Sequence, residues 1–233
     1  DGRIKPEIVT KGVAVMSTDS SGNSDYSSSQ GTSMASPAIA GNALLLQQYY
    51  NSLNTSYMRA ATLKGLILHT ALEAGDDPGP DYMFGFGLIN TEAAANLITA
   101  KANQSAVIEE VNLNNNATYT KTISVTAGKP LVVSISWTDP AYVSSNSGTI
   151  DPTTKYLVND LDVRVTRNGV TYFPWTLNPA VVWQAAVRNA DNSRDNYEKI
   201  EIDAAATRTY TSTVTHKGNL KSGQPQNFSL IAS

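Results

Sequence analysis

The chain has 233 residues, of which 41% are hydrophobic and 16% are charged, and its formal net charge at pH 7 is −3. This composition supports a buried core and excludes a disordered chain, while the small negative charge and the lack of a Lys/Arg block argue against nucleic acid and anionic membranes as partners. The sequence has no cysteine, which excludes disulfides, and no run of about 18 apolar residues that would predict a transmembrane helix.

The first thirty residues predict short strands and a loop. "DGRIKPEIVT" at 1–10 ends in an apolar run that fits a buried strand, and residues 13–16 are a second short candidate. Residues 19–29 are dense in Ser, Gly and Asn, which predicts a polar loop.

Three helices are expected in the next seventy residues. From Met34 onwards, apolar residues step at three to four positions, and Pro37 falls in the expected first turn, where its missing N–H costs little. A second apolar stripe predicts a helix over 55–73. A third is expected over 92–100, with Thr91 as its N-cap and Glu92 in its first turn.

After about residue 104 the hydrophobic period changes to two. Alternating segments follow one another without a helix between them, and Asn168-Gly169 separates two of them as a hairpin turn would. Six to eight such strands predict an antiparallel sandwich. We therefore expect two domains, 1–104 and 105–233.

Ser33 is the principal candidate for chemistry. It lies in "GTSMASP", between Gly31 and the start of the first expected helix. A helix N-terminus offers unpaired N–H groups and a dipole that favours negative charge, which is what an attacking hydroxyl and a developing oxyanion need. The alternative is that Ser33 only caps the helix.

The heptapeptide that contains Ser33 resembles the nucleophile motif of the subtilisin-like serine proteases, the subtilases. "DGRIKPEIVTKG" at 1–12 resembles the family's strand before this loop, with a mild departure at Glu7 and at Thr10-Lys11-Gly12. "FGFGLINTEAAANLI" at 84–98 resembles its closing turn and last helix. The strand-rich remainder, with "LVNDLDV" at 157–163 and "RDNYEKIEI" at 194–202, resembles a sandwich appended to some bacterial subtilases.

The resemblance implies the C-terminal portion of an α/β catalytic domain, built on a mainly parallel sheet with helices, followed by an all-β, antiparallel, jelly-roll-like sandwich. It implies a secreted, extracellular endopeptidase that hydrolyses polypeptides. Ser33 would be the nucleophile and would contribute its N–H to the oxyanion hole, with Thr32 in support and no cofactor for catalysis. The family's catalytic Asp, catalytic His and oxyanion Asn precede this segment, so an upstream part of the catalytic domain is the expected partner.

The chain alone is expected to be inactive. His69 and His216 are its two histidines, and neither has the family's His-Gly-Thr setting, so each is interpreted as a packing or surface residue. A serine without its histidine loses nearly all nucleophilic catalysis. One alternative is an inert fragment whose sandwich stabilises the fold or binds substrate. A pseudoenzyme is disfavoured because Ser33 and its surroundings are intact.

A calcium site in the sandwich is a further expectation. Asp160 and Asp162 are two apart on an expected strand and so project to the same side, and Asp139 and Asp195 are loop carboxylates that the fold could bring near. Carboxylates and carbonyls suit Ca²⁺, whereas zinc is disfavoured without cysteine. The resemblance adds that calcium often stabilises subtilases. The alternative is that these aspartates accept hydrogen bonds from backbone N–H groups in turns.

Overall fold

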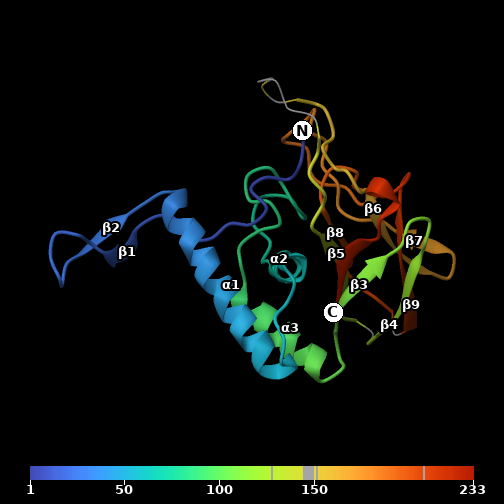
Figure 1. Cartoon of the computed structure of the whole chain (residues 1–233), viewed down its shortest axis with the longest axis horizontal. Helices are drawn as coiled ribbons and strands as arrows, with labels where there is room; N and C mark the ends of the chain where they lie inside the picture. Colours follow the sequence, from blue (N-terminus) through green and yellow to red (C-terminus); the bar gives the residue numbers. More distant parts are fainter. Residues whose placement is uncertain (127, 144–149, 151, 207) are drawn as a thin grey trace.

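The computed structural model describes residues 1–126, 128–143, 150, 152–206 and 208–233. The chain forms a helical part followed by a β-sandwich (Figure 1). The helical part contains β1 (Val15–Thr18), β2 (Tyr26–Ser29), α1 (Thr32–Asn54), α2 (Ala60–His69) and α3 (Thr91–Ala102). None of the helices in these described ranges is long and apolar enough to cross a membrane.

The sandwich is an eight-stranded jelly roll. Its strands are β3 (Val107–Leu113), β4 (Tyr119–Val125), β5 (Leu131–Trp137), β6 (Leu161–Arg167), β7 (Val170–Tyr172), β8 (Tyr197–Ile202), β9 (Arg208–His216) and β10 (Gln226–Ala232), with a short 3-10 turn at Lys221–Gly223. One sheet has the order β3-β10-β5-β8 and the other β4-β9-β6-β7, with antiparallel pairing throughout. This arrangement of two four-stranded sheets confirms the predicted sandwich.

The core of the sandwich lies between the two sheets. Alternate residues of the strands point inward, as the period of two requires, and Trp137, Tyr210 and Phe228 are fully buried there among branched aliphatic side chains. The turn between β6 and β7 is the predicted hairpin. Asn168 and Gly169 both have positive φ, 49° and 78°, as a two-residue hairpin turn demands.

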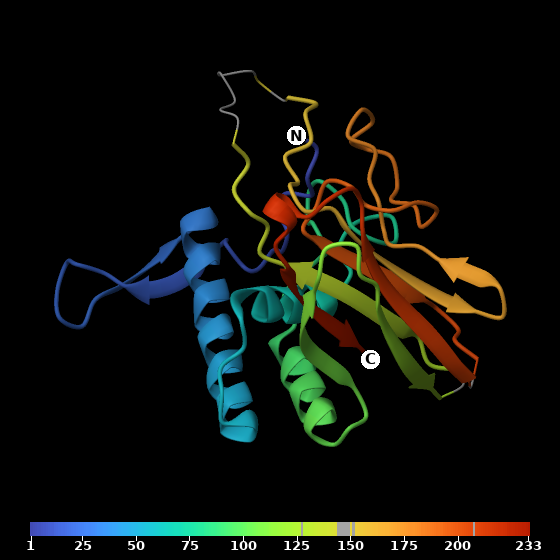
Figure 2. The ribbon, with the colours of Figure 1, turned by 45° about the vertical axis from the view of Figure 1, so that its right-hand side comes forward.

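α2 and α3 cover the outer face of the β3-β10-β5-β8 sheet, and α1 packs on the far side of these two helices (Figure 2). α2 lies directly on β5 and β10. A Cβ at Gly65 of α2 would stand 2.9 Å from Cβ of Ser136, so small residues allow this close approach. α1 packs on α3 through Leu46 and Tyr50, and the β1–β2 hairpin projects beyond the start of α1 (Figure 1).

The predicted parallel sheet is not present in the described residues. There, only Val9 and Leu88 pair in parallel, as an isolated bridge, and the one sheet of the helical part is the antiparallel hairpin of β1 and β2. A parallel sheet needs several strands joined by long crossovers. The segment at 1–10 that we expected to be a strand therefore runs as a loop, joined at Val9 to the turn after Gly87.

Several predicted boundaries also differ. β2 occupies part of the expected polar loop. α1 begins two residues before Met34, which places Pro37 in its second turn, and α2 begins at Ala60 rather than at residue 55. The N-cap of α3 is Asn90, not Thr91, because the Asn90 side chain accepts a hydrogen bond from the backbone N–H of Ala93 at 3.0 Å.

Candidate functional site

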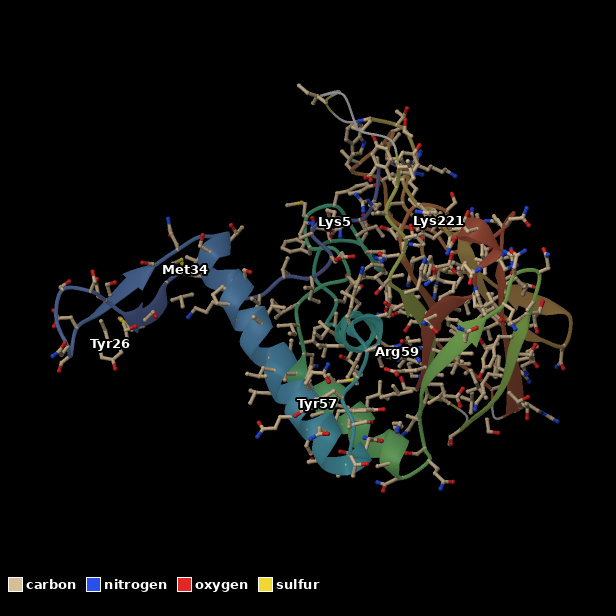
Figure 3. All side chains as sticks on the ribbon, in the orientation of Figure 1. Lys5, Tyr26, Met34, Tyr57, Arg59 and Lys221 are labelled. Carbon is tan, nitrogen blue, oxygen red and sulfur yellow. The ribbon has the colours of Figure 1, made fainter. Side chains whose placement is uncertain are left out.

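Ser33 lies at the N-terminal end of α1, on the surface. Gly31 is the N-cap, with φ 140° and ψ 170°, a conformation that L side chains rarely adopt, and Thr32 and Ser33 are the first two residues of the helix. The alternative that Ser33 caps the helix is therefore wrong, because it lies inside it and no side chain caps this end. Met34, the next residue, marks this end of α1 in Figure 3.

The start of α1 is exposed and leaves backbone N–H groups available to a ligand. Thr32 and Ser33 are both exposed, and in the described part of the chain neither backbone N–H has a hydrogen-bond acceptor. These are the groups that an α-helix leaves without an intrahelical partner at its beginning. Together with the helix dipole they form a surface that can stabilise a negative oxygen close to the Ser33 hydroxyl.

The turn before Ser33 is held by backbone contacts. Gly31 N–H donates to the carbonyl of Gly12 at 2.7 Å, and the Gly31 carbonyl accepts from Met34 N–H at 3.0 Å. Pro37 has no N–H to donate to the Ser33 carbonyl, the residue four positions back, so that carbonyl lacks its usual helical partner.

His69 serves the packing between the two parts of the chain, as its setting predicted. It is buried at the end of α2, with Nδ1 2.8 Å from Ser134 Oγ and Nε2 3.0 Å from Ser233 Oγ. Burial lowers the pKa of His69 to about 3, so the ring is neutral at neutral pH.

His216 has a structural contact as well. Its Nε2 accepts a hydrogen bond from the backbone N–H of Asn116 at 2.7 Å, at the end of β9 in the sandwich. Both histidines therefore act within or against the sandwich, and neither is placed at the start of α1 as a base for Ser33.

Asp139 and Asp195 hold backbone segments in place. Asp139 accepts from the N–H groups of Val158 and Asn159 at 2.7 and 2.8 Å. Asp195 is buried and accepts from the N–H of Ile4 at 2.8 Å, which ties the beginning of the chain to the sandwich. These hydrogen bonds from backbone N–H groups fit the alternative in which the aspartates hold turns in place. Burial raises the pKa of both carboxyl groups.

Asp160 and Asp162 do lie together, around the ammonium group of Lys217. Lys217 Nζ is 4.0 Å from a carboxylate oxygen of Asp160, 2.9 Å from Asp162 and 3.2 Å from Asp191. Burial raises the pKa of Asp160 to about 6 and also raises that of Asp162. Asp191 was not predicted, because no local pattern links it to residues thirty positions earlier.

The predicted set of four aspartates is thus not assembled as one site. Within the described ranges, no group of three or more His, Cys, Asp or Glu side chains is placed to hold a metal ion. Lys217 supplies the positive charge that the Asp160 and Asp162 pair requires.

Comparison with known proteins concerns mainly the helical part. The model of the subtilase family, a peptidase family, matches residues 1–87. Subtilisin DY of Bacillus licheniformis is 42% identical over 89 residues, which are 38% of this chain and 28% of that protein. Residues 1–87 are subtilase-like. The C5a peptidase of Streptococcus pyogenes is 29% identical over 140 residues, 56% of this chain and 12% of that protein.

The chain therefore spans less than a third of the length of either relative. Among solved structures, a mitogen derived from Yersinia pseudotuberculosis has a TM-score of 0.30 at 13% identity, over 55% of this chain and 84% of that one. The subtilase-like part contains the open start of α1, with Gly31, Thr32 and Ser33.

Proposed function

We propose that this chain is the C-terminal portion of a secreted, subtilisin-like serine endopeptidase, and that Ser33 is the nucleophile that attacks peptide bonds. The proposal is carried by one observation: an exposed serine, with unpaired backbone N–H groups beside it, lies at the start of α1 within the subtilase-like residues 1–87. Similarity to a subtilisin and to a C5a peptidase supports the serine peptidase class.

In this proposal Ser33 has two roles. Its hydroxyl forms the bond to the substrate carbonyl carbon, and its own N–H donates to the oxygen that becomes negative. Thr32 precedes it with a second unpaired N–H and a polar side chain. The helix dipole adds a favourable potential for the oxyanion.

The base that takes the Ser33 proton would come from an upstream part of the catalytic domain. The apolar surface of the helical part supports such a partner. α1 buries Leu46 and Tyr50 on one side, yet Leu44 is 71% exposed and Leu45 is 58% exposed on the rest of its surface. Large exposed apolar patches mark interaction sites, so this side of α1 fits a surface that another part of the protein covers.

The other candidate is an inert module in which the sandwich supports or extends the fold. It is favoured by the placement of His69 and His216, which are both engaged away from Ser33. The two candidates make different predictions for a complete protein, meaning this chain together with the upstream segment, but the same prediction for this chain alone.

The test is the Ser33→Ala variant of the complete protein. We expect peptide hydrolysis to fall by about four or more orders of magnitude, because the members of a catalytic triad act as a unit. The melting temperature should hardly change, because Ser33 is exposed. Peptide turnover and thermal melting measure the two effects.

The control is the 233-residue chain without any second polypeptide. With no base beside Ser33, we expect neither peptidase activity nor rapid labelling by a serine-directed phosphonate. Wild-type turnover in the Ser33→Ala protein would refute the nucleophile. Stoichiometric labelling of the isolated chain would refute the need for an upstream partner.

A further inference from the structure

The base of the β1–β2 hairpin is closed by two glycines. Gly12 precedes β1 and Gly31 follows β2, and Gly31 N–H donates to the Gly12 carbonyl at 2.7 Å. The two backbones are in close contact: a Cβ at Gly12 would stand 2.9 Å from the carbonyl oxygen of Gly31 and 3.4 Å from Cβ of Ala35. Both neighbours belong to the turn that contains Ser33.

The beginning of α1 has little other support in the described structure. The buried residues of this helix are Leu46 and Tyr50, both in its second half. The nearest side-chain tie is at Asn42, whose Oδ1 accepts from Thr91 Oγ1 at 2.8 Å. Ser33 is nine residues before Asn42, about 13 Å along a helix. The Gly12 contact is therefore what locates the nucleophile end of α1.

Gly12 is itself held at a defined place. Val9 N–H donates to the Gly87 carbonyl at 3.0 Å, and the Val9 carbonyl accepts from Ile89 N–H at 3.0 Å. The same segment accepts a hydrogen bond from Phe86 N–H at Glu7, at 2.9 Å. Three residues later the chain reaches Gly12, so the turn before Ser33 rests on a segment bonded to the rest of the helical part.

We propose that Gly12 is a positioning residue for Ser33: its carbonyl binds Gly31 N–H, and its lack of a side chain lets the two backbones meet. This inference rests on the proposed function of Ser33. Gly12 does not have positive φ, so an alanine there meets no backbone strain of its own. Its methyl group would instead press on the Gly31 carbonyl, which is backbone and can yield only by moving the start of α1.

The test compares Gly12→Ala with Gly22→Ala in the complete protein. Gly22 lies near the tip of the same hairpin, and a Cβ there would also stand 2.9 Å from its nearest neighbour, but that neighbour is the exposed side chain of Asp25, which can rotate away. For Gly12→Ala we expect kcat to fall about tenfold with KM within about twofold, because a displaced nucleophile loses orientation rather than substrate binding.

The readout must separate displacement from partial unfolding. Labelling of Ser33 is therefore measured well below the melting temperature of each variant, where almost every molecule is folded. There a lower rate constant for phosphonate labelling reports displacement of Ser33, and a lower final extent reports molecules that have unfolded irreversibly. We expect Gly12→Ala to lower the rate constant about tenfold and to leave the extent unchanged. Gly22→Ala should change neither.

Each outcome bears on the proposal. An unchanged rate constant in Gly12→Ala would overturn it, as would an equal loss in Gly22→Ala. If Gly12→Ala does not fold, amide exchange of the wild-type protein decides: Gly31 N–H should be protected relative to Thr32 and Ser33, and equal exchange at all three would overturn it. Ser33→Ala, run in parallel, identifies failure of the proposed function itself, because it would then keep full turnover.

Discussion

At the scale of single residues, His69 is a buried histidine whose pKa lies well below its usual range. Its ring is buried between α2 and β5, and each ring nitrogen faces a serine hydroxyl. A neutral imidazole has one N–H, so one of these serines accepts a hydrogen bond from the ring and the other donates to it. A proton on the second nitrogen would place a positive charge in a buried site, and the charge of Lys199 opposes it further.

We therefore expect the stability of the protein to fall in mild acid. The folded state keeps His69 neutral down to about pH 3, whereas an unfolded histidine binds a proton near pH 6.5. The stability that this provides is complete above pH 6.5 and is lost as the pH falls from there towards 3. At pH 5 the loss is about 2 kcal/mol.

Urea unfolding at pH 7.5 and pH 5 measures this effect. In His69→Gln the difference between the two pH values should shrink by that amount, and His216→Gln shows what removal of a histidine elsewhere does. Asp160, Asp162 and Glu198 have raised pKa values through burial and act in the opposite sense, but they are common to all three proteins. Equal pH dependence in wild type and His69→Gln would contradict the prediction.

Sequence reasoning at this scale succeeded where a motif has local meaning. "GTSMASP" located an exposed serine at a helix start, since Gly31 and the helix that follows are neighbours in sequence. Sequence reasoning did not predict the contacts of Asp139 and Asp195, because their backbone partners lie 20 and 191 residues away. The role of Gly12 was also hidden, because it arises only when residues 12 and 31 meet.

At the scale of elements, the pairing of β6 with β9 decides how the acidic residues are neutralised. Leu161 is opposite His216 and Asp162 is opposite Thr215, and Lys217 N–H donates to the Asp160 carbonyl at 2.8 Å. This register brings the Lys217 ammonium to the two carboxylates that the period of two had already placed on one side of the strand. A cation from solution would have to displace the Lys217 ammonium group from these carboxylates.

We expect millimolar calcium, compared with a chelator, to leave the melting temperature of the wild-type chain unchanged. Lys217→Met should melt lower in chelator, because it leaves Asp160, Asp162 and Asp191 to repel one another, and calcium should restore part of the loss. Each kcal/mol corresponds to about 2–4 °C in a chain of this size. Lys129→Met, an exposed lysine elsewhere, is the control. A clear rise of the wild-type melting temperature with calcium would support the sequence prediction instead.

The hydrophobic period predicted the type of most elements correctly, but it predicted their first and last residues poorly. The segments that alternate after residue 104 correspond to β4 to β10, whereas the "EE" in "VIEEVNL" interrupts the alternation in β3. The expected helix over 55–73 loses its first turn and its last residues. Arg59 N–H and Thr62 Oγ1 bind Glu110 of β3, a tertiary contact that no helical pattern contains.

Taken as a whole, the molecule joins a sandwich of two four-stranded sheets to a helical part whose sheet, in the described residues, is a two-stranded hairpin. The β1–β2 hairpin projects away from the core, and Tyr26 is exposed on it (Figure 3). The fold class of the sandwich followed from its strand period, whereas the parallel sheet expected of the first 104 residues could not form from the strands that these residues contain.

We expect the isolated chain to self-associate through α1. Leu45→Lys should shift it towards monomer in sedimentation at micromolar concentration, because it removes apolar area from the exposed patch. In the complete protein the same change should lower the free energy of unfolding by about 2–4 kcal/mol, since a charge would then be buried. Val170→Lys, at an exposed position of β7, is the control. No loss of stability in the complete protein would show that α1 is not covered there.

The place of β10 has a consequence for how the protein is made. Residues 226–232 lie between β3 and β5, so the sheet they join has a gap at its centre until they have been synthesised. From the synthesis of β5 until that of β10, β3 and β5 each present an unpaired edge, the kind of surface that recruits other chains. Ser229 and Ile231 also contact the helical layer. The jelly roll and its attachment to the helices are therefore completed together, once β10 has been made.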